Sequence, residues 1–130
     1  LASGARDTEF GASFSALSEA MTAHPDLVSG TARNDEAFMR AGRGDWVSKV
    51  GADGVQTLAS RSRGIGIAAK VSDGNLKALM VAFCSVLEQL GMLDDTAKAA
   101  LESWSRVPIK SIRGIEVGAI EPHVLLKRTA

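Results

Sequence analysis

Apolar residues recur along the chain with two different periods, and each period predicts one kind of element. Spacings of three and four predict amphipathic helices over about 8–24 and 76–90, with a shorter helix after Asp94-Asp95. An apolar anchor at Phe38, followed by two glycines, predicts a further short helix over 34–41. Alternating patterns predict strands over 46–50, 55–60 and 65–71, and a final hairpin that turns at Arg113-Gly114.

The order of these elements predicts an α+β fold. A helix, a strand meander, more helices and a hairpin favour helices laid on a mainly antiparallel sheet. The chain has 130 residues, and its hydrophobic fraction of 45% suits one compact core. Because no internal repeat or low-complexity linker divides the sequence, we expect a single domain over residues 1–130.

Charge and cysteine content exclude several classes of partner and site. Fifteen acidic and fifteen Lys or Arg residues give a formal net charge of zero, so no overall field attracts nucleic acid or an anionic membrane. Cys84 is the single cysteine, so it has no disulfide partner in the chain, and we expect it to be inert packing on its helix. The sequence has no Cys/His cluster with metal-ligand spacing and no apolar run long enough for a bilayer, so we expect a cytoplasmic protein.

The most distinctive chemical feature is a lysine inside a short apolar strand that ends at glycines. Lys49 precedes Gly51-Ala52-Asp53-Gly54, where glycine lets the backbone turn sharply and approach a bound group. Such a lysine is either a base or charge partner for a nucleophile, or a residue whose stem lies on the sheet while its ammonium reaches water. Ser48 adjoins it, but alternation places the two side chains on opposite faces, so Ser48 is not predicted to be the nucleophile.

Several stretches together resemble the bacterial L-asparaginases of the Rhizobium type, the asparaginase II family. The resemblance runs from about His24 to Pro122 and departs from the family's pattern at Ser111, where asparagine is common. The order and spacing of the stretches make it specific. In chain order they are His24-Pro25, Val28-Ser29-Gly30, Arg33-x-Asp35, Lys49-x-Gly51-Ala52-Asp53-Gly54-Val55, Gly64-Ile65, Lys70-Val71-Ser72-Asp73-Gly74, Leu87-x-x-Leu90-Gly91, Val107-Pro108 and Gly114-x-x-Val117-Gly118-x-Ile120-x-Pro122.

The resemblance implies a fold similar to that of glutaminases and serine β-lactamases, and hydrolysis of the side-chain amide of L-asparagine to L-aspartate and ammonia. In the family the reaction passes through an acyl-serine, and Lys49 matches the lysine supplied from this part of the protein. Family members are much longer, so this chain would be a C-terminal portion. The serine of an S-x-x-K motif and the cysteines of a metal site would lie in an N-terminal portion that it lacks. We therefore expect no cofactor or metal in this chain, no activity from it alone, and a homodimer at full length.

Four further residues are predicted to contact the substrate. Arg33 and Asp35 match the family's Gly-x-x-Arg-x-Asp stretch, and their charges suit the α-carboxylate and α-ammonium of an amino acid. Gly51 and Asp53 lie in the turn after Lys49, where Asp53 would hold Lys49 or the ligand. Each charged residue also has a plainer interpretation: a loop or capping ion pair for Arg33 and Asp35, and turn formation for Asp53.

Two other functions fit the same residues. The Lys-x-Gly pattern alone also suits another amidohydrolase on this scaffold, either glutaminase-like or penicillin-recognising. A chain without a nucleophile can also be a non-catalytic domain left by proteolysis, or a subunit that associates through Trp46, Trp104 or an exposed sheet edge. The asparaginase hypothesis differs from these in its predicted partners, which are L-asparagine and the remainder of the same polypeptide.

Overall fold

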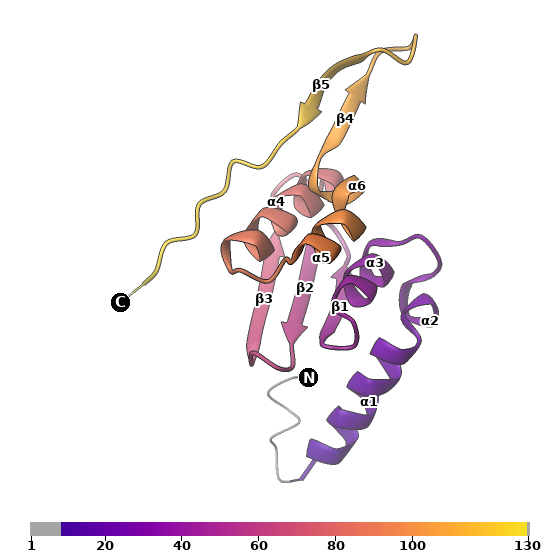
Figure 1. Cartoon of the computed structure of the whole chain (residues 1–130), viewed down its shortest axis with the longest axis vertical. Helices are drawn as coiled ribbons and strands as arrows, with labels where there is room; N and C mark the ends of the chain where they lie inside the picture. The colour runs from indigo at the N-terminus through magenta and orange to yellow at the C-terminus, as the bar shows by residue number, and fades with distance from the viewer. Residues whose placement is uncertain (1–8, 130) are drawn as a thin grey trace.

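The computed structural model describes residues 9–129, and it has the predicted α+β architecture (Figure 1). Three antiparallel strands form the main sheet in the order β1-β2-β3, and two more strands form a separate hairpin. The strands are β1 (Trp46–Gly51), β2 (Val55–Ser60), β3 (Ile65–Lys70), β4 (Val107–Lys110) and β5 (Glu116–Ile120). The helices are α1 (Gly11–Ala23), α2 (Pro25–Ser29), α3 (Asn34–Ala41), α4 (Leu76–Gln89), α5 (Asp95–Ala100) and α6 (Glu102–Ser105).

The central elements have nearly the bounds that the sequence predicts. Both α3 and β2 begin and end at the predicted residues, and β1 and β3 differ from prediction by one residue at their C-terminal ends. The Asn75 side chain accepts hydrogen bonds from the backbone N–H groups of Lys77 and Ala78, and this N-cap fixes the start of α4. The single helix expected after Asp94 is divided into α5 and α6.

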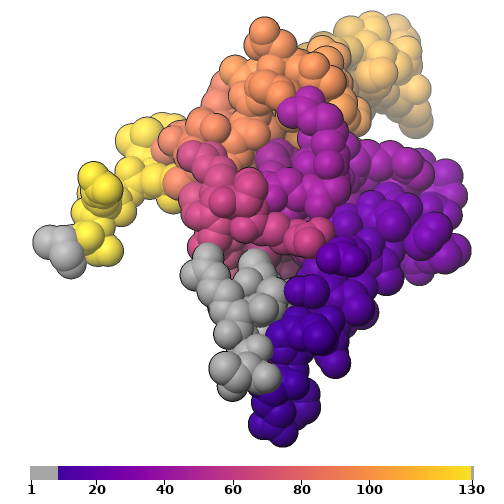
Figure 2. Space-filling view, turned by 60° about the horizontal axis from the view of Figure 1, so that its bottom comes forward, coloured from indigo at the N-terminus to yellow at the C-terminus, as the bar shows by residue number. Residues whose placement is uncertain are grey.

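The N-terminal region differs more from prediction. Pro25 does end the first helix, but it also opens α2 at the first helical position, where the missing N–H of proline leaves no bond unmade. Leu17 belongs to the predicted apolar stripe of α1, yet it is 50% exposed. Figure 2 shows α1 in indigo at one end of the molecule, away from the hairpin. The periodicity identified the helix but not how much of its stripe is buried.

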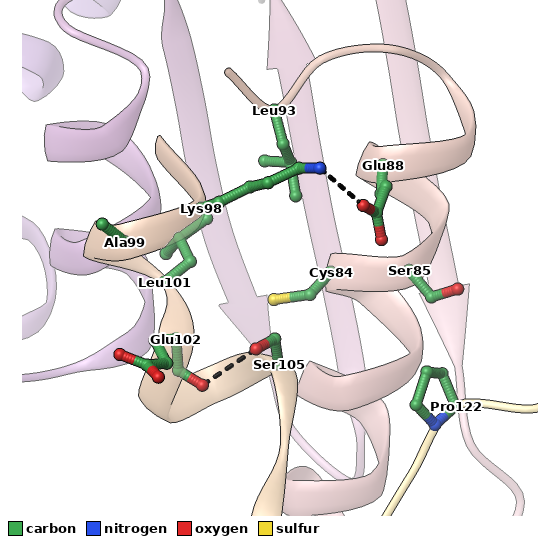
Figure 3. A pocket seen from close by; sticks show the side chains of 10 residues that line it. All are labelled: Cys84, Ser85, Glu88, Leu93, Lys98, Ala99, Leu101, Glu102, Ser105 and Pro122. Atoms are coloured by element: carbon green, nitrogen blue, oxygen red, sulfur yellow. Dashed lines mark hydrogen bonds and ion pairs between the residues drawn. The ribbon is translucent and has the colours of Figure 1, made fainter. Parts of the chain in front are cut away.

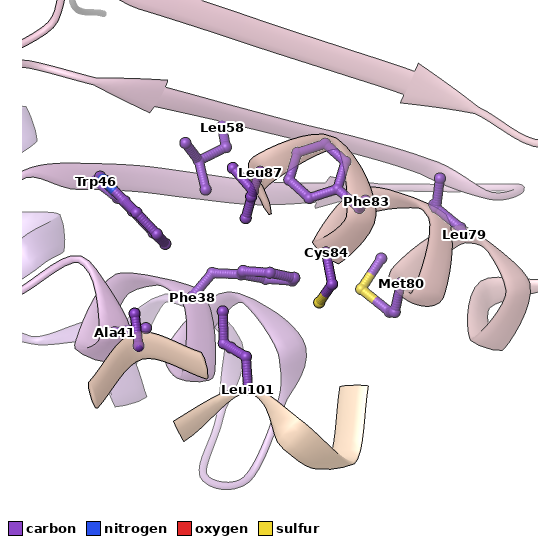
Figure 4. Close-up of a cluster of buried hydrophobic side chains, with 11 residues drawn as sticks. Phe38, Ala41, Trp46, Leu58, Leu79, Met80, Phe83, Cys84, Leu87 and Leu101 are labelled. Carbon is purple, nitrogen blue, oxygen red and sulfur yellow. The ribbon is translucent and has the colours of Figure 1, made fainter. Parts of the chain in front are cut away.

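The main hydrophobic core lies between the sheet and helices α3, α4 and α5 (Figure 4). Phe38 of α3 and Phe83 of α4 meet edge to face, with ring centroids 5.5 Å apart. Leu87 on α4 is fully buried in the same cluster. Because α3 packs against β1 while α4 packs against β2 and β3, the helices fix the position of every strand in the main sheet.

The C-terminal part of the chain extends from this body. The hairpin β4-β5 points away from the main sheet, and the segment after it runs back past α4 (Figure 1). Gln89 fastens that segment to α4: its side-chain amide donates to the carbonyl of Val124 (2.8 Å) and accepts from the N–H of Leu126 (2.9 Å). Within residues 9–129, no helix is both long and apolar enough to cross a membrane.

Candidate functional site

Strand β1 presents Lys49 at an edge of the main sheet. Side chains alternate along the strand, so Trp46 and Ser48 are buried against the helices while Lys49 is exposed. The Lys49 side chain is 53% exposed to solvent. Its Nζ donates a hydrogen bond to the carbonyl of Val50 (2.7 Å) and lies 3.9 Å from Oδ2 of Asp35. The ammonium is therefore held at the strand edge, but one side of it is open to solvent.

Asp35 lies beneath this edge and is fully buried. It occupies the first turn of α3, where the helix dipole favours a negative charge. Its Oδ1 accepts hydrogen bonds from Ser48 Oγ (2.8 Å) and Gln56 Nε2 (2.9 Å). Its Oδ2 accepts one from the backbone N–H of Val50 (2.8 Å) and faces the Lys49 ammonium. These donors compensate the cost of removing a carboxylate from water.

The buried network continues through a glutamine that the sequence analysis did not single out. Gln56 Nε2 also donates to Ser48 Oγ (2.8 Å), and its Oε1 accepts from Asn34 Nδ2 (2.7 Å). Among the described residues, no buried side-chain nitrogen or oxygen is without a hydrogen-bond partner. The sequence did carry a signal, because Ser48 and Gln56 are polar residues at inward positions of predicted strands.

Arg33 lies immediately before α3 and is exposed. Within residues 9–129 its guanidinium makes no hydrogen bond or ion pair, so the loop ion pair with Asp35, the plainer interpretation of these two residues, is not formed. Because Arg33 and Asp35 are two residues apart, their Cα atoms are within about 7.6 Å of each other. The Arg33 side chain therefore branches from the backbone close to Asp35, the residue whose carboxylate lies beside Lys49. Its positive charge is available to bind an anion.

The turn between β1 and β2 is packed against the connection between β3 and α4. Asp53 and Gly54 both have positive φ (57° and 74°), and the Asp53 side chain is 83% exposed. Lys70 donates to the Asp53 carbonyl and lies 3.4 Å from Asp53 Oδ2, while the N–H of Val71 donates to the Gly54 carbonyl (3.0 Å). Asp53 therefore forms the turn and pairs with Lys70, and no hydrogen bond or ion pair joins it to Lys49 among the described residues. The structure brings together two stretches that are about twenty residues apart in the sequence.

Two of the cavities among the described residues bear on the sequence-based predictions. One, of about 440 Å³, is on the outer face of the main sheet, where Lys49, Thr57 and Ala59 contribute to its floor and Met21 of α1 to its wall. The other, of about 480 Å³, lies between α4 and the α5-α6 pair and includes none of the predicted site residues (Figure 3).

The second cavity contains the single cysteine. The Cys84 side chain points toward the space between α4 and α6, and the Lys98–Glu88 ion pair (2.8 Å) spans the cavity (Figure 3). Burial raises the pKa of the Cys84 thiol to about 12, so the group is a small apolar side chain at neutral pH. No group of three or more His, Cys, Asp or Glu residues within 9–129 is arranged to hold a metal ion.

Comparison with known proteins places the chain in a family. The model of the L-asparaginase II family matches residues 1–122, which include every predicted site residue. A search of curated proteins found no match. The family match confirms the resemblance seen in the sequence, and it supports an asparaginase-like function of the amidohydrolase class. The chain belongs to the L-asparaginase II family.

Proposed function

We propose that this chain is the C-terminal portion of an enzyme that hydrolyses the side-chain amide of L-asparagine to L-aspartate and ammonia. The observation that carries the proposal is the half-exposed Lys49 ammonium, held at the edge of β1 in a chain that matches the L-asparaginase II family. In this hypothesis the whole protein is a cytoplasmic homodimer, and its metal site belongs to the N-terminal portion.

The proposed reaction uses a serine from the N-terminal portion. Its hydroxyl oxygen attacks the amide carbon, the C–N bond breaks and ammonia leaves with the transferred proton; water then hydrolyses the acyl-serine ester and regenerates the hydroxyl. Within residues 9–129 no serine hydroxyl is hydrogen-bonded to Lys49, and Ser48 is buried and directed at Asp35. This favours a nucleophile from outside the described residues.

Lys49 has the proposed role of base or charge partner to that serine. A serine hydroxyl is a weak nucleophile until a neighbouring group takes its proton, and lysine serves this purpose in other Ser-Lys enzymes. The open side of the Lys49 ammonium gives a serine room to approach, because the Val50 carbonyl that it bonds and the nearby Asp35 carboxylate are both on the protein side.

Substrate recognition is assigned to groups around the same strand end. The exposed Arg33 guanidinium, with no ion pair among the described residues, suits the α-carboxylate of asparagine. Gly51 ends β1 without a side chain, so the backbone after Lys49 is accessible to a ligand. Asp53, exposed in the adjacent turn, suits the α-ammonium group and is positioned by Lys70.

Ammonia release by the full-length protein tests this function. L-asparagine and L-glutamine differ by one methylene, and we expect kcat/KM to favour asparagine by at least about tenfold. A chromogenic penicillin-type lactam serves as the third substrate. Equal turnover of glutamine, or hydrolysis of the lactam, would assign the protein to another amidohydrolase class. No turnover of any of the three would support a non-catalytic role. The 130-residue chain alone should release no ammonia.

A further inference from the structure

The Asp35 carboxylate belongs to a hydrogen-bonded network that joins three consecutive elements of the chain, α3, β1 and β2. Asp35 and Asn34 belong to α3, Ser48 to β1 and Gln56 to β2, and their side chains form one hydrogen-bonded network. Because the network is fully buried, each member has few alternative partners. It fixes the start of α3 against the middle of β1.

The two oxygens of the Asp35 carboxylate contact different parts of the structure. Oδ1 accepts only from side chains of the network, Ser48 Oγ and Gln56 Nε2. Oδ2 faces the edge of β1, where it accepts from the N–H of Val50 and lies 3.9 Å from Lys49 Nζ. The network thus immobilises Oδ1 and thereby aims Oδ2 at the segment that contains Lys49.

The residue Val50 is held at both of its backbone groups. Its N–H donates to Asp35 Oδ2, and its carbonyl accepts from Lys49 Nζ (2.7 Å). The Asp35 carboxylate and the Lys49 ammonium are therefore both hydrogen-bonded to the backbone of Val50. The two charges are 3.9 Å apart, so they attract each other without a direct hydrogen bond. Moving the carboxylate would shift both the strand and the ammonium.

We propose that Asp35 is a positioning residue that holds the Val50 backbone and the Lys49 ammonium in place, and that it does not bind substrate itself. The inference rests on the proposed function in that Lys49 is taken as the catalytic lysine. It replaces the sequence-based role of Asp35 as ligand of the substrate ammonium, because a fully buried carboxylate with these partners has no free face for a ligand. Asp53 is the exposed carboxylate near this strand end.

The test compares two Asp→Asn variants in the full-length protein. Asp35→Asn removes the charge beneath Lys49. Asp45→Asn is the matched control, because Asp45 also accepts hydrogen bonds from a serine hydroxyl (Ser60) and from a backbone N–H (Ser62), at the opposite end of β1.

For Asp35→Asn we expect kcat on asparagine to fall at least about tenfold with KM changed less than about twofold. Asp45→Asn should keep both constants near those of the unmodified enzyme. A raised KM at unchanged kcat for Asp35→Asn would show direct substrate binding and overturn the proposal.

A second measurement is independent of asparagine hydrolysis. Hydrogen exchange of the Val50 amide reports its bond to Asp35 directly, and we expect at least about tenfold faster exchange in Asp35→Asn than in Asp45→Asn. Unchanged Val50 exchange in the Asp35 variant would overturn the positioning role. If the full-length protein does not hydrolyse asparagine, the proposed function fails, while this exchange rate still tests the role of Asp35.

Asp35→Glu covers the case in which Asp35→Asn does not fold. Glutamate keeps the charge, but its side chain is longer by one methylene. Its carboxylate oxygens are therefore displaced from the position in which Asp35 Oδ2 accepts the Val50 N–H. A positioning role predicts loss of kcat and faster Val50 exchange in this variant. Full activity with unchanged exchange would show that the location of the carboxylate is not important.

Discussion

Gly54 and Gly74 pack backbone against backbone, so closely that a Cβ on Gly54 would stand 2.9 Å from the Cα of Gly74. The same Cβ would come within 2.6 Å of a Val71 methyl group. Gly54 closes the turn that follows Lys49, and Gly74 precedes the core helix α4. The contact therefore couples the position of the strand end that carries the site to the main core.

Gly54→Ala should destabilise the chain more than its backbone angle alone requires. Gly91→Ala is the control, because Gly91 also has positive φ (62°) but its Cβ would meet nothing within 4 Å. Both variants incur the left-handed penalty of about 1 kcal/mol. The clash should add about 1–3 kcal/mol for Gly54→Ala. Urea unfolding of the two variants measures the difference, and equal midpoints would show that the turn can move away from Gly74.

Leu87→Ala should lower the free energy of unfolding by about 2–5 kcal/mol, as for other large apolar side chains truncated in a packed core. Leu87 is fully buried in the cluster between the sheet and the helices (Figure 4). Leu27 on α2 is 80% exposed, and Leu27→Ala should change stability by less than about 0.5 kcal/mol. Coincident urea midpoints for Leu87→Ala and the unmodified chain would contradict this arrangement of the core.

The fold was largely predictable from the sequence because its elements have clear local patterns. Strand alternation correctly placed Lys49 and Ser48 on opposite faces, and the glycines after Phe38 correctly marked the C-terminal end of α3. The exposure of Leu17 was not predictable, because helical spacing shows which residues share a face but not what covers that face.

The candidate site was predictable only in part, for the same reason. Lys49 and the turn after it are local features, and the family resemblance drew attention to them. The burial of Asp35 depends on Gln56, which is 21 residues away, and on the packing of α3 against β1. A single sequence shows polar residues at inward strand positions, but it does not show which carboxylate they meet. The roles of Lys49, Arg33, Asp35, Gly51 and Asp53 stay predictions.

Cys84 should be unreactive in the folded chain. Burial raises the pKa of its thiol to about 12, so at pH 8 only on the order of one thiol in ten thousand is ionised. We expect a disulfide exchange reagent such as Ellman's reagent to react at the rate of unfolding, and rapidly in 6 M guanidinium, about the concentration that unfolds even very stable domains. Because Cys84 is the single cysteine of the chain, the absorbance change reports it alone. Rapid labelling under native conditions would show that the cavity beside α4 opens.

Asp45 should contribute to stability at neutral pH and lose that contribution in acid. Partial burial raises its pKa, but hydrogen bonds from Ser60 Oγ and the Ser62 N–H to its carboxylate outweigh this, so its pKa lies below the ordinary value of 3.8. The folded chain thus binds the proton less readily than the unfolded chain, and stability is lost as the pH falls from about 4 through the folded-state pKa. Asp45→Asn should cost about 1 kcal/mol at pH 6. The gap between the two unfolding midpoints should narrow by pH 3, and a constant gap would exclude this titration.

The Lys49 side chain should matter for catalysis and not for folding. In the full-length protein, Lys49→Met keeps most of the stem length and removes the ammonium, so it isolates the charge. We expect kcat on asparagine to fall by at least about a hundredfold, the lower range for loss of a general acid-base group. The melting temperature should stay close to that of the unmodified protein, because the side chain is 53% exposed and Asp35 retains three hydrogen bonds.

Two further variants show whether Lys49 acts as a base or as a charge partner, and whether the effect is specific to Lys49. Lys49→Arg keeps a positive charge but should not restore turnover, because a guanidinium stays protonated and cannot accept the serine proton. Lys77→Met makes the same substitution on an exposed residue of the first turn of α4 and should leave kcat unchanged. If Lys49→Arg retains near-normal turnover, the residue acts as a charge partner and not as a base. If Lys49→Met retains it, the ammonium has no part in the reaction and Lys49 is a surface residue of β1, whatever serves as the catalytic base.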